Sequence, residues 1–169
     1  MALNIVLFQP QIPQNTGNIA RTCAALKAVL HLVHPLGFSI NEKSVKRAGL
    51  DYWTLLDIRE YSSTAQFFER NKDKEFWFFT TKGRTIYTDV NYSEDTFLIF
   101  GSETKGIDES ILFEHPASCL RLPMREESRS LNLSNSVAVA AFEFERQQNY
   151  QSLLKKGELH NLKWPKTQN

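Results

Sequence analysis

The sequence of this 169-residue chain predicts an α/β fold in which helices flank a mainly parallel sheet. Three observations support this prediction. Short apolar runs that are typical of buried strands alternate with segments of helical periodicity. The connections between these segments are short, as in units of strand, helix and parallel strand. Polar motifs follow directly after predicted strands, where parallel sheets bind ligands beyond their carboxyl ends.

The composition fits one domain over residues 1–150, followed by a polar tail over 151–169 that we expect to be loose or weakly docked. Hydrophobic residues make up 41% and charged residues 23%, which is a globular composition. A net charge of +1 argues against a protein that coats nucleic acid through its overall charge, but it is compatible with a local basic patch that recognises RNA. Two cysteines, Cys23 and Cys119, are too few for a disulfide framework or a zinc site, so we expect no metal.

The N-terminal run Met1–Pro10 lacks the basic start and the cleavage site of a signal peptide. No apolar run approaches the ~20 residues that span a bilayer. We therefore expect a cytoplasmic protein with no membrane contact.

In the first half, Leu3–Phe8 predicts a strand, and the turn formers after it lead into a helix. One face of that helix is predicted to carry Ile19, Cys23, Leu26 and Leu30. His31–His34 predicts a second strand, and Ser39–Leu50 has the composition of a charged helix.

The second half continues the alternation. Strands are predicted at 54–61, 75–81, 96–100 and 118–122, and helices at 63–71 and at 108–113, the latter capped by Asp108. The last helix has two apolar faces, which predicts two packing partners. Its core face carries Leu133, Val137, Ala140, Ala141 and Phe144, and its second face carries Val139 and Phe142.

The first polar motif, Asn15–Arg21, opens the first helix. An ordinary helix start explains part of it, with Asn15 or Thr16 as the cap. Arg21 lies roughly 200° around the helix from Cys23, so it points away from the core, where a guanidinium can hold a phosphate through two hydrogen bonds.

The second group of motifs follows two central strands. Phe79–Arg84 is either a surface turn with solvated charges or a site for a ligand that carries carboxylate or phosphate. Phe100–Ile107 has the glycine spacing of half a phosphate loop, but Ile107 and Asp108 stand where Lys and Ser or Thr are required, which excludes nucleoside triphosphate binding. The chain also has no G-x-G-x-x-G. What remains is a glycine that permits close approach of a ligand and a carboxylate, Glu103.

The third motif comprises Leu120–Met124 and Ser128–Asn135, before the last helix. A helix N-cap explains one of its polar residues but not the series. Together the three motifs, in this order, resemble those of the SPOUT RNA methyltransferases. The compact subgroup that methylates the wobble ribose of tRNA is the most similar. The resemblance runs from Leu3 to about Tyr150 and includes Arg47–Tyr52.

The resemblance implies a C-terminal deep trefoil knot, S-adenosylmethionine as cofactor with S-adenosylhomocysteine as product, and a homodimer. In the dimer, one subunit's cofactor would lie near the other's RNA-binding residues, and Val139 and Phe142 would pack across the interface. Leu122 and Leu131 would line the adenine pocket. The implied cofactor residues are Phe79, Thr80, Gly101, Ser102, Glu103, Leu122, Ser130, Leu131 and Asn132.

The implied activity is methylation of the ribose 2′-hydroxyl of the wobble nucleotide, cytidine or modified uridine. Catalytic residues would be Arg21, Asn15 and Glu103. A guanidinium is a poor base, so we expect Arg21 to orient the hydroxyl and a neighbouring phosphate. Contacts to the anticodon stem-loop would come from Arg21, Lys43, Lys46 and Arg47, although the last three also suit a solvated helix face.

Two alternatives remain open from the sequence. One is 2′-O-methylation at another site of tRNA or in rRNA, which relatives of this fold perform. The other is an RNA-binding or regulatory protein that keeps the fold without catalysis. Asn135, like Asn15, could serve only to brace its loop.

Overall fold

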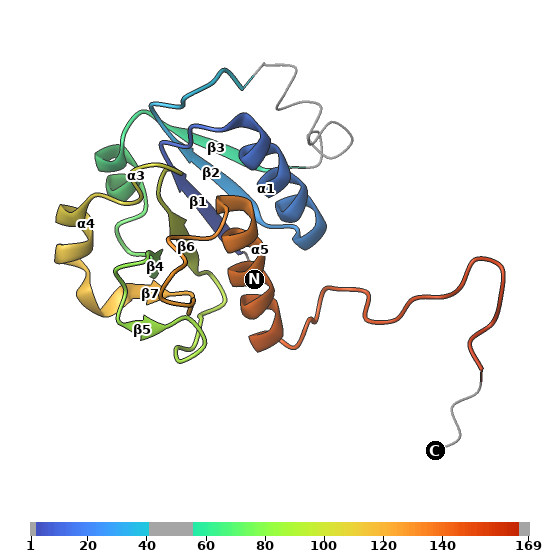
Figure 1. The fold of residues 1–169 in the computed structure, drawn as a ribbon. Coiled ribbons are helices and arrows are strands. Elements are labelled where there is room, and N and C mark those ends of the chain that lie inside the picture. Colours follow the sequence, from blue (N-terminus) through green and yellow to red (C-terminus); the bar gives the residue numbers. More distant parts are fainter. Residues whose placement is uncertain (1–2, 41–55, 166–169) are drawn as a thin grey trace.

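The computed structural model describes residues 3–40 and 56–165, and its strands form one seven-stranded sheet (Figure 1). The strands are β1 (Asn4–Phe8), β2 (Val29–Val33), β3 (Ile58–Tyr61), β4 (Phe76–Phe79), β5 (Thr85–Ile86), β6 (Phe97–Phe100) and β7 (Cys119–Arg121). Their order is β3-β2-β1-β6-β4-β7-β5, and every neighbouring pair is parallel. The predicted parallel sheet is therefore confirmed.

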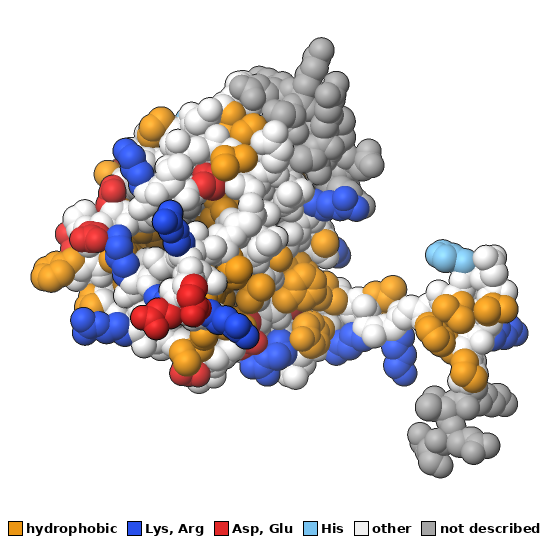
Figure 2. All heavy atoms as spheres, in the orientation of Figure 1, with side chains coloured by type: hydrophobic (Ala, Val, Ile, Leu, Met, Phe, Trp, Pro, Cys, Tyr) orange, Lys and Arg blue, Asp and Glu red, His pale blue; other side chains and the backbone are white. Residues whose placement is uncertain are grey.

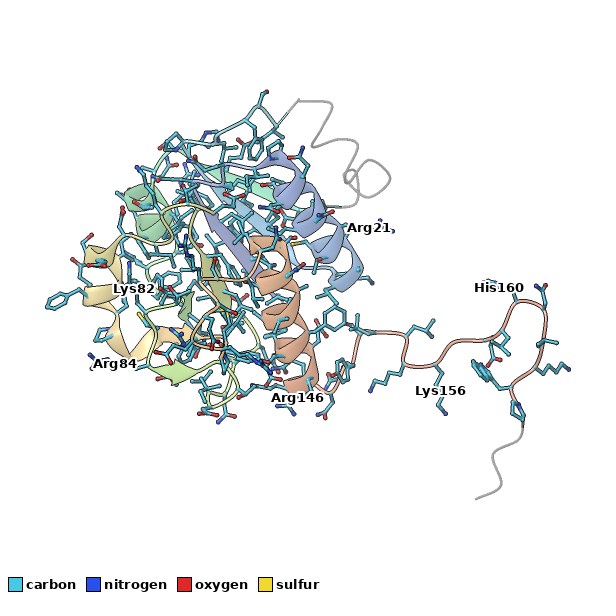
Figure 3. All side chains as sticks on the ribbon, in the orientation of Figure 1. Arg21, Lys82, Arg84, Arg146, Lys156 and His160 are labelled. Atoms are coloured by element: carbon cyan, nitrogen blue, oxygen red, sulfur yellow. The ribbon has the colours of Figure 1, made fainter. Side chains whose placement is uncertain are left out.

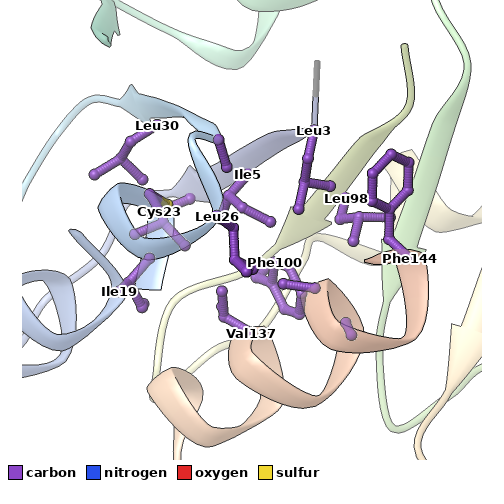
Figure 4. Close-up of a cluster of buried hydrophobic side chains, with 14 of the residues drawn as sticks. Leu3, Ile5, Ile19, Cys23, Leu26, Leu30, Leu98, Phe100, Val137 and Phe144 are labelled. Atoms are coloured by element: carbon purple, nitrogen blue, oxygen red, sulfur yellow. The ribbon is translucent and has the colours of Figure 1, made fainter. Parts of the chain in front are cut away.

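Helices cover both faces of this sheet. They are α1 (Pro13–Leu26), α3 (Thr64–Arg70), α4 (Glu109–Glu114) and α5 (Leu133–Gln147), with a short 3-10 helix, η2 (Pro116–Ser118). β1 is buried along its whole length between β2 and β6. Because successive strand residues point to opposite faces, Ile5 and Leu7 pack with α1 and α5, while Val6 and Phe8 pack with α3 and α4. Figure 4 shows the cluster under α1 and α5.

The last helix has the two faces that its periodicity predicts. Val137, Ala140, Ala141 and Phe144 are buried and Leu133 packs against the same cluster. The other face carries Val139, which is 41% exposed, and Phe142, which is 49% exposed. That this second face meets another subunit stays a prediction.

Three details of the sequence interpretation are wrong. Helix α1 ends at Leu26 because Lys27 adopts a left-handed conformation (φ 54°), so Leu30 lies in β2 and not on the helix. Its N-cap is Ile12, and Asn15 and Thr16 lie inside the first turns. Asp108 does precede α4, but its side chain makes no capping hydrogen bond. β5 was not predicted because two residues carry no readable pattern.

Residues 151–165 contain no helix or strand and extend away from the sheet (Figure 1). Leu153 packs against the core, whereas Leu154, Leu162 and Trp164 are exposed. The domain boundary near residue 150 and the trefoil knot stay predictions. The helix predicted over Ser39–Leu50 lies, from residue 41 onward, outside the described residues, as does the start of the strand predicted at 54–61.

The two cysteines are small buried residues, as the composition suggested. Cys23 is fully buried, and burial raises the pKa of its thiol to about 12. Burial also raises the pKa of Cys119. Within 3–40 and 56–165, no helix has the length and apolar character needed to cross a bilayer.

A buried polar network crosses the first three strands. The Nε2 atom of His31 lies 3.0 Å from the side-chain oxygen of Asn4, and Nδ1 lies 2.9 Å from the hydroxyl of Tyr61. Since the Asn4 amide nitrogen donates to the carbonyl of Thr96, its oxygen must accept, so Nε2 carries the proton and Nδ1 accepts from Tyr61. Burial, with a smaller effect of the positive charge of Arg59, lowers the pKa of His31 to about 4.

This network predicts an acid-sensitive fold. Because the folded state holds His31 neutral, the unfolded state binds one more proton between about pH 6.5 and pH 4, and stability is lost as the pH falls through that window. From pH 7 to pH 5 the loss from His31 should be about 2 kcal/mol. Urea unfolding at both pH values measures it. His31→Gln, which keeps one donor and one acceptor, should flatten this dependence.

The control is His160→Gln, which removes a histidine of the exposed tail and should leave the pH dependence unchanged. An unaltered slope in His31→Gln would show that other groups produce the acid sensitivity.

Candidate functional site

A pocket of about 460 Å³ lies where the carboxyl ends of β4, β6 and β7 meet the N-terminal turn of α1. Its walls come from three loops that are distant in sequence: 79–82, 100–107 and 122–136. The structure places all nine of the sequence-predicted cofactor residues on these walls: Phe79, Thr80, Gly101, Ser102, Glu103, Leu122, Ser130, Leu131 and Asn132. A cavity of this size at the ends of parallel strands is typical of a small-molecule site.

The pocket is lined both by aromatic and aliphatic groups and by hydroxyl groups. The rings of Phe79 and Phe100 stack with centroids 4.8 Å apart and planes 18° from parallel. Leu131 lies on the rim, 43% exposed, while Ser102 is buried. The pocket therefore offers an apolar surface for a flat group beside polar atoms for its substituents.

The loop after β6 is a tight turn that folds back on itself. The backbone N–H of Gly106 donates to the carbonyl of Ser102 (2.9 Å), and Gly106 has φ 71°. A Cβ atom on Gly101 would lie 2.0 Å from the carbonyl carbon of Gly106, so no larger residue fits. The sequence interpretation attributed this glycine to the close approach of a ligand. In the structure the close neighbour is the loop's own backbone.

The carboxylate of Glu103 caps helix α1. One oxygen accepts the backbone N–H of Gln11 (2.8 Å), and the other accepts the N–H of Ile12 (3.1 Å) and the side-chain amide of Asn15 (3.0 Å). The helix has no capping side chain of its own and no acidic residue in its first turn. A negative charge at a helix N-terminus is favourable because the first N–H groups have no partner within the helix.

Asn15 links Glu103 to the third motif. Its side-chain oxygen accepts a hydrogen bond from the amide of Asn132 (3.0 Å). Asn132 is in turn the N-cap of α5, and its oxygen accepts from the backbone N–H (2.9 Å) and the hydroxyl (2.7 Å) of Ser134. The Glu103–Asn15–Asn132 chain thus joins all three polar motifs and the start of both helices.

Arg21 does not line the pocket in the described part of the chain. It is exposed on the side of α1 away from Cys23, as the helical angle predicts. Figure 3 shows it beside α1, on the other side of the view from Lys82 and Arg84. The structure therefore brings Asn15 and Glu103 together with the predicted cofactor residues but not Arg21.

Three further cations line the pocket, Lys82, Lys105 and Arg129. The sequence interpretation included Lys82 in a candidate site for a carboxylate or phosphate ligand but gave Lys105 and Arg129 no role. Each of the three belongs to one of the polar motifs described above, and this was the signal in the sequence that could have identified them as pocket residues. Lys43, Lys46 and Arg47 lie outside the described residues. Among the described residues there is no cluster of three or more potential metal ligands.

Relatives of known sequence and structure are similar to this chain over most of its length. A Listeria monocytogenes protein is 50% identical over 157 residues, which are 91% of this chain and 93% of the relative. The tRNA (cytidine(34)-2′-O)-methyltransferase of Escherichia coli K12 is 42% identical over 149 residues, which are 88% of this chain and 95% of that enzyme. A solved structure from work on the 2-OH methylation of C/U34 on tRNA is 42% identical to this chain and has a TM-score of 0.84. The match covers 89% of this chain and 98% of the chain in that structure.

The model of the SpoU rRNA Methylase family matches residues 2–142, which contain the whole sheet, the pocket and the Glu103–Asn15–Asn132 chain. This extent of match and the identity to its relatives lead to one conclusion: the chain belongs to the SpoU rRNA methylase family.

Proposed function

We propose that the protein transfers the methyl group of S-adenosylmethionine to the ribose 2′-hydroxyl of the wobble nucleotide of tRNA, either cytidine or modified uridine. The observation that carries this proposal is that all nine predicted cofactor residues line a single pocket. The E. coli relative, at 42% identity, is named for this reaction at cytidine 34. Because tRNA is modified in the cytoplasm, we expect the protein to act there.

The pocket suits the cofactor by its chemistry. The side chains of Leu122 and Leu131 give apolar walls for the adenine ring, and the loop backbone around them offers donors and acceptors for its edge. Hydroxyl groups of Thr80, Ser102 and Ser130 are available to its polar groups. Bound there, S-adenosylmethionine supplies a methyl group on a sulfonium, which is already a good leaving group. The protein must therefore mainly position the ribose hydroxyl and ease loss of its proton.

Glu103 acts in this proposal as a positioning residue. Both of its oxygens already accept hydrogen bonds, three in all, from the start of α1 and from Asn15. A carboxylate occupied in this way fixes the loop that it belongs to and the amide of Asn15. It thereby sets the shape of the pocket wall instead of receiving the proton of the ribose hydroxyl.

Arg21 acts on the substrate from the other subunit of a homodimer. The cofactor pocket and Arg21 do not meet within the described part of one chain, whereas the exposed Val139 and Phe142 offer α5 an apolar surface for a second copy. In the dimer, Arg21 orients the 2′-hydroxyl and a neighbouring phosphate through its forked guanidinium. Proton loss is completed by solvent or a neighbouring group.

The anticodon stem-loop of tRNA is the proposed RNA element, and phosphate contacts supply much of its binding. Lys105 and Arg129 place positive charge along the pocket wall. Lys43, Lys46 and Arg47 are proposed to add further phosphate contacts. Binding should therefore weaken as the salt concentration rises.

The first prediction tests the function itself. Calorimetry should detect binding of S-adenosylmethionine, and incubation with labelled cofactor and total tRNA should place the methyl group on the ribose of the wobble nucleotide. Label at another position, or in rRNA instead, would refute the wobble assignment. Failure to bind the cofactor would refute the methyltransferase proposal and favour a non-catalytic RNA-binding protein.

The second prediction concerns Glu103→Gln. The glutamine side chain has one oxygen and one N–H₂ group, and the N–H₂ group cannot accept a hydrogen bond from a backbone N–H. The variant should therefore lose about 1 kcal/mol of stability and bind S-adenosylmethionine less tightly. Thermal unfolding and calorimetry measure the two effects. Glu69→Gln, on the exposed surface of α3, is the matched control and should change neither. A variant that loses turnover while keeping both properties would instead indicate proton transfer by Glu103.

The third prediction concerns the composite site. Arg21→Ala and Leu131→Trp, which fills the pocket, should each lose turnover as pure proteins. Mixed dimers should regain activity, because one site in each then combines an intact Arg21 with an open pocket. Arg21→Lys keeps the charge but loses the fork, so its turnover should fall.

Adding Phe142→Glu to both the Arg21→Ala and the Leu131→Trp chains should weaken the dimer and prevent the mixture from regaining activity. Analytical ultracentrifugation measures the oligomeric mass. Mixtures that stay inactive while exchanging subunits would contradict the shared site.

A further inference from the structure

A second hollow lies beside the pocket and shares part of its wall with it. This α4 groove, of about 810 Å³, lies between the segment after β4 and helix α4 with the turn that follows it. Thr80 and Lys82 line both the pocket and the groove. A chain-like ligand with one unit at the pocket mouth therefore has a direct path into the groove.

Phe113 projects from α4 on the wall of this groove and is 86% exposed. The preceding residue, Leu112, is 8% exposed and belongs to the core under α3 and α4. The helix is thus anchored by Leu112, and the ring of Phe113 contributes almost nothing to the core. A single exposed apolar residue is ordinary. An aromatic face on the wall of a groove that adjoins a ligand pocket is a better indication of binding.

The charges around the ring select the type of ligand. Lys82 forms an exposed ion pair with Glu109 at 2.9 Å, so part of its charge is offset by that carboxylate. Arg84 also lines the groove and forms no hydrogen bond or ion pair with the other residues of 3–40 and 56–165. Glu114 lines the groove as well, so Arg84 is the group there that favours an anionic part of a ligand. In Figure 2 the surface over α4 carries hydrophobic, basic and acidic side chains together.

We propose that the α4 groove binds a nucleotide of the RNA next to the one that is methylated, with its base stacked on Phe113 and its phosphate held by Arg84. Exposed aromatic rings beside guanidinium groups are a common way to hold unpaired nucleotides, because every base has a face to stack. The bases of an anticodon loop are unpaired, so a neighbour of the reacting nucleotide is available to the groove. This inference rests on the proposed function and names a subsite for its substrate.

The test measures the affinity for an anticodon stem-loop RNA by fluorescence anisotropy, together with KM and kcat for tRNA. Phe113→Leu, which keeps an apolar side chain but removes the aromatic face, should weaken binding and raise KM by roughly tenfold, with kcat and cofactor affinity unchanged. Phe113→Trp should bind at least as tightly as the wild type. Arg84→Gln should weaken binding and lower the salt dependence by about one ion.

Matched controls come from the tail: Leu154→Ala, at a residue that is 92% exposed, and Lys156→Gln, at an exposed cation. Both should leave RNA affinity unchanged. The proposal is overturned if Phe113→Leu binds RNA as tightly as the wild type, or if it weakens binding only by changing the oligomeric mass, which would assign the groove to a second copy. A wild type that binds the cofactor but does not bind or methylate tRNA overturns the proposed function itself.

Discussion

The carboxylate of Glu103 at the start of helix α1 is the interaction on which the pocket depends. It joins the loop after β6 to the loop after β1, and through Asn15 it reaches the cap of α5. No local side chain caps α1, and the N–H groups of Gln11 and Ile12 just before the helix bind this distant acid instead. The loop after β6, the start of α1 and the loop before α5 are therefore coupled, and a change in one displaces the pocket walls contributed by the others.

Sheet topology explains why this coupling occurs here. From β1 the chain moves outward through β2 to β3, and β4 to β7 lie on the other side of β1, where β6 is its direct neighbour. Strand order thus reverses between β1 and β6, and the loops that leave the two strands diverge to opposite sides. Such a switch point leaves a crevice beyond the strand ends. Glu103 and Asn15 meet across it.

Much of this architecture was predictable because it follows from local pattern. Apolar runs identified six of the seven strands, and helical spacing identified the buried face of α5 and the outward position of Arg21. The errors have a common cause. The cap of α1 comes from a residue about 90 positions away, and the need for Gly101 comes from backbone that folds back on it, as only a three-dimensional structure shows. Local sequence identifies a residue as polar or small but does not identify its partner.

The separation of Arg21 from the pocket constrains any mechanism. A guanidinium that orients the ribose must lie near the methyl donor, yet Arg21 is absent from the pocket wall of the described chain. Either the RNA bridges the two regions or another copy supplies the arginine. The exposed apolar face of α5, carrying Val139 and Phe142, favours the second route because it gives another copy a surface on which to pack.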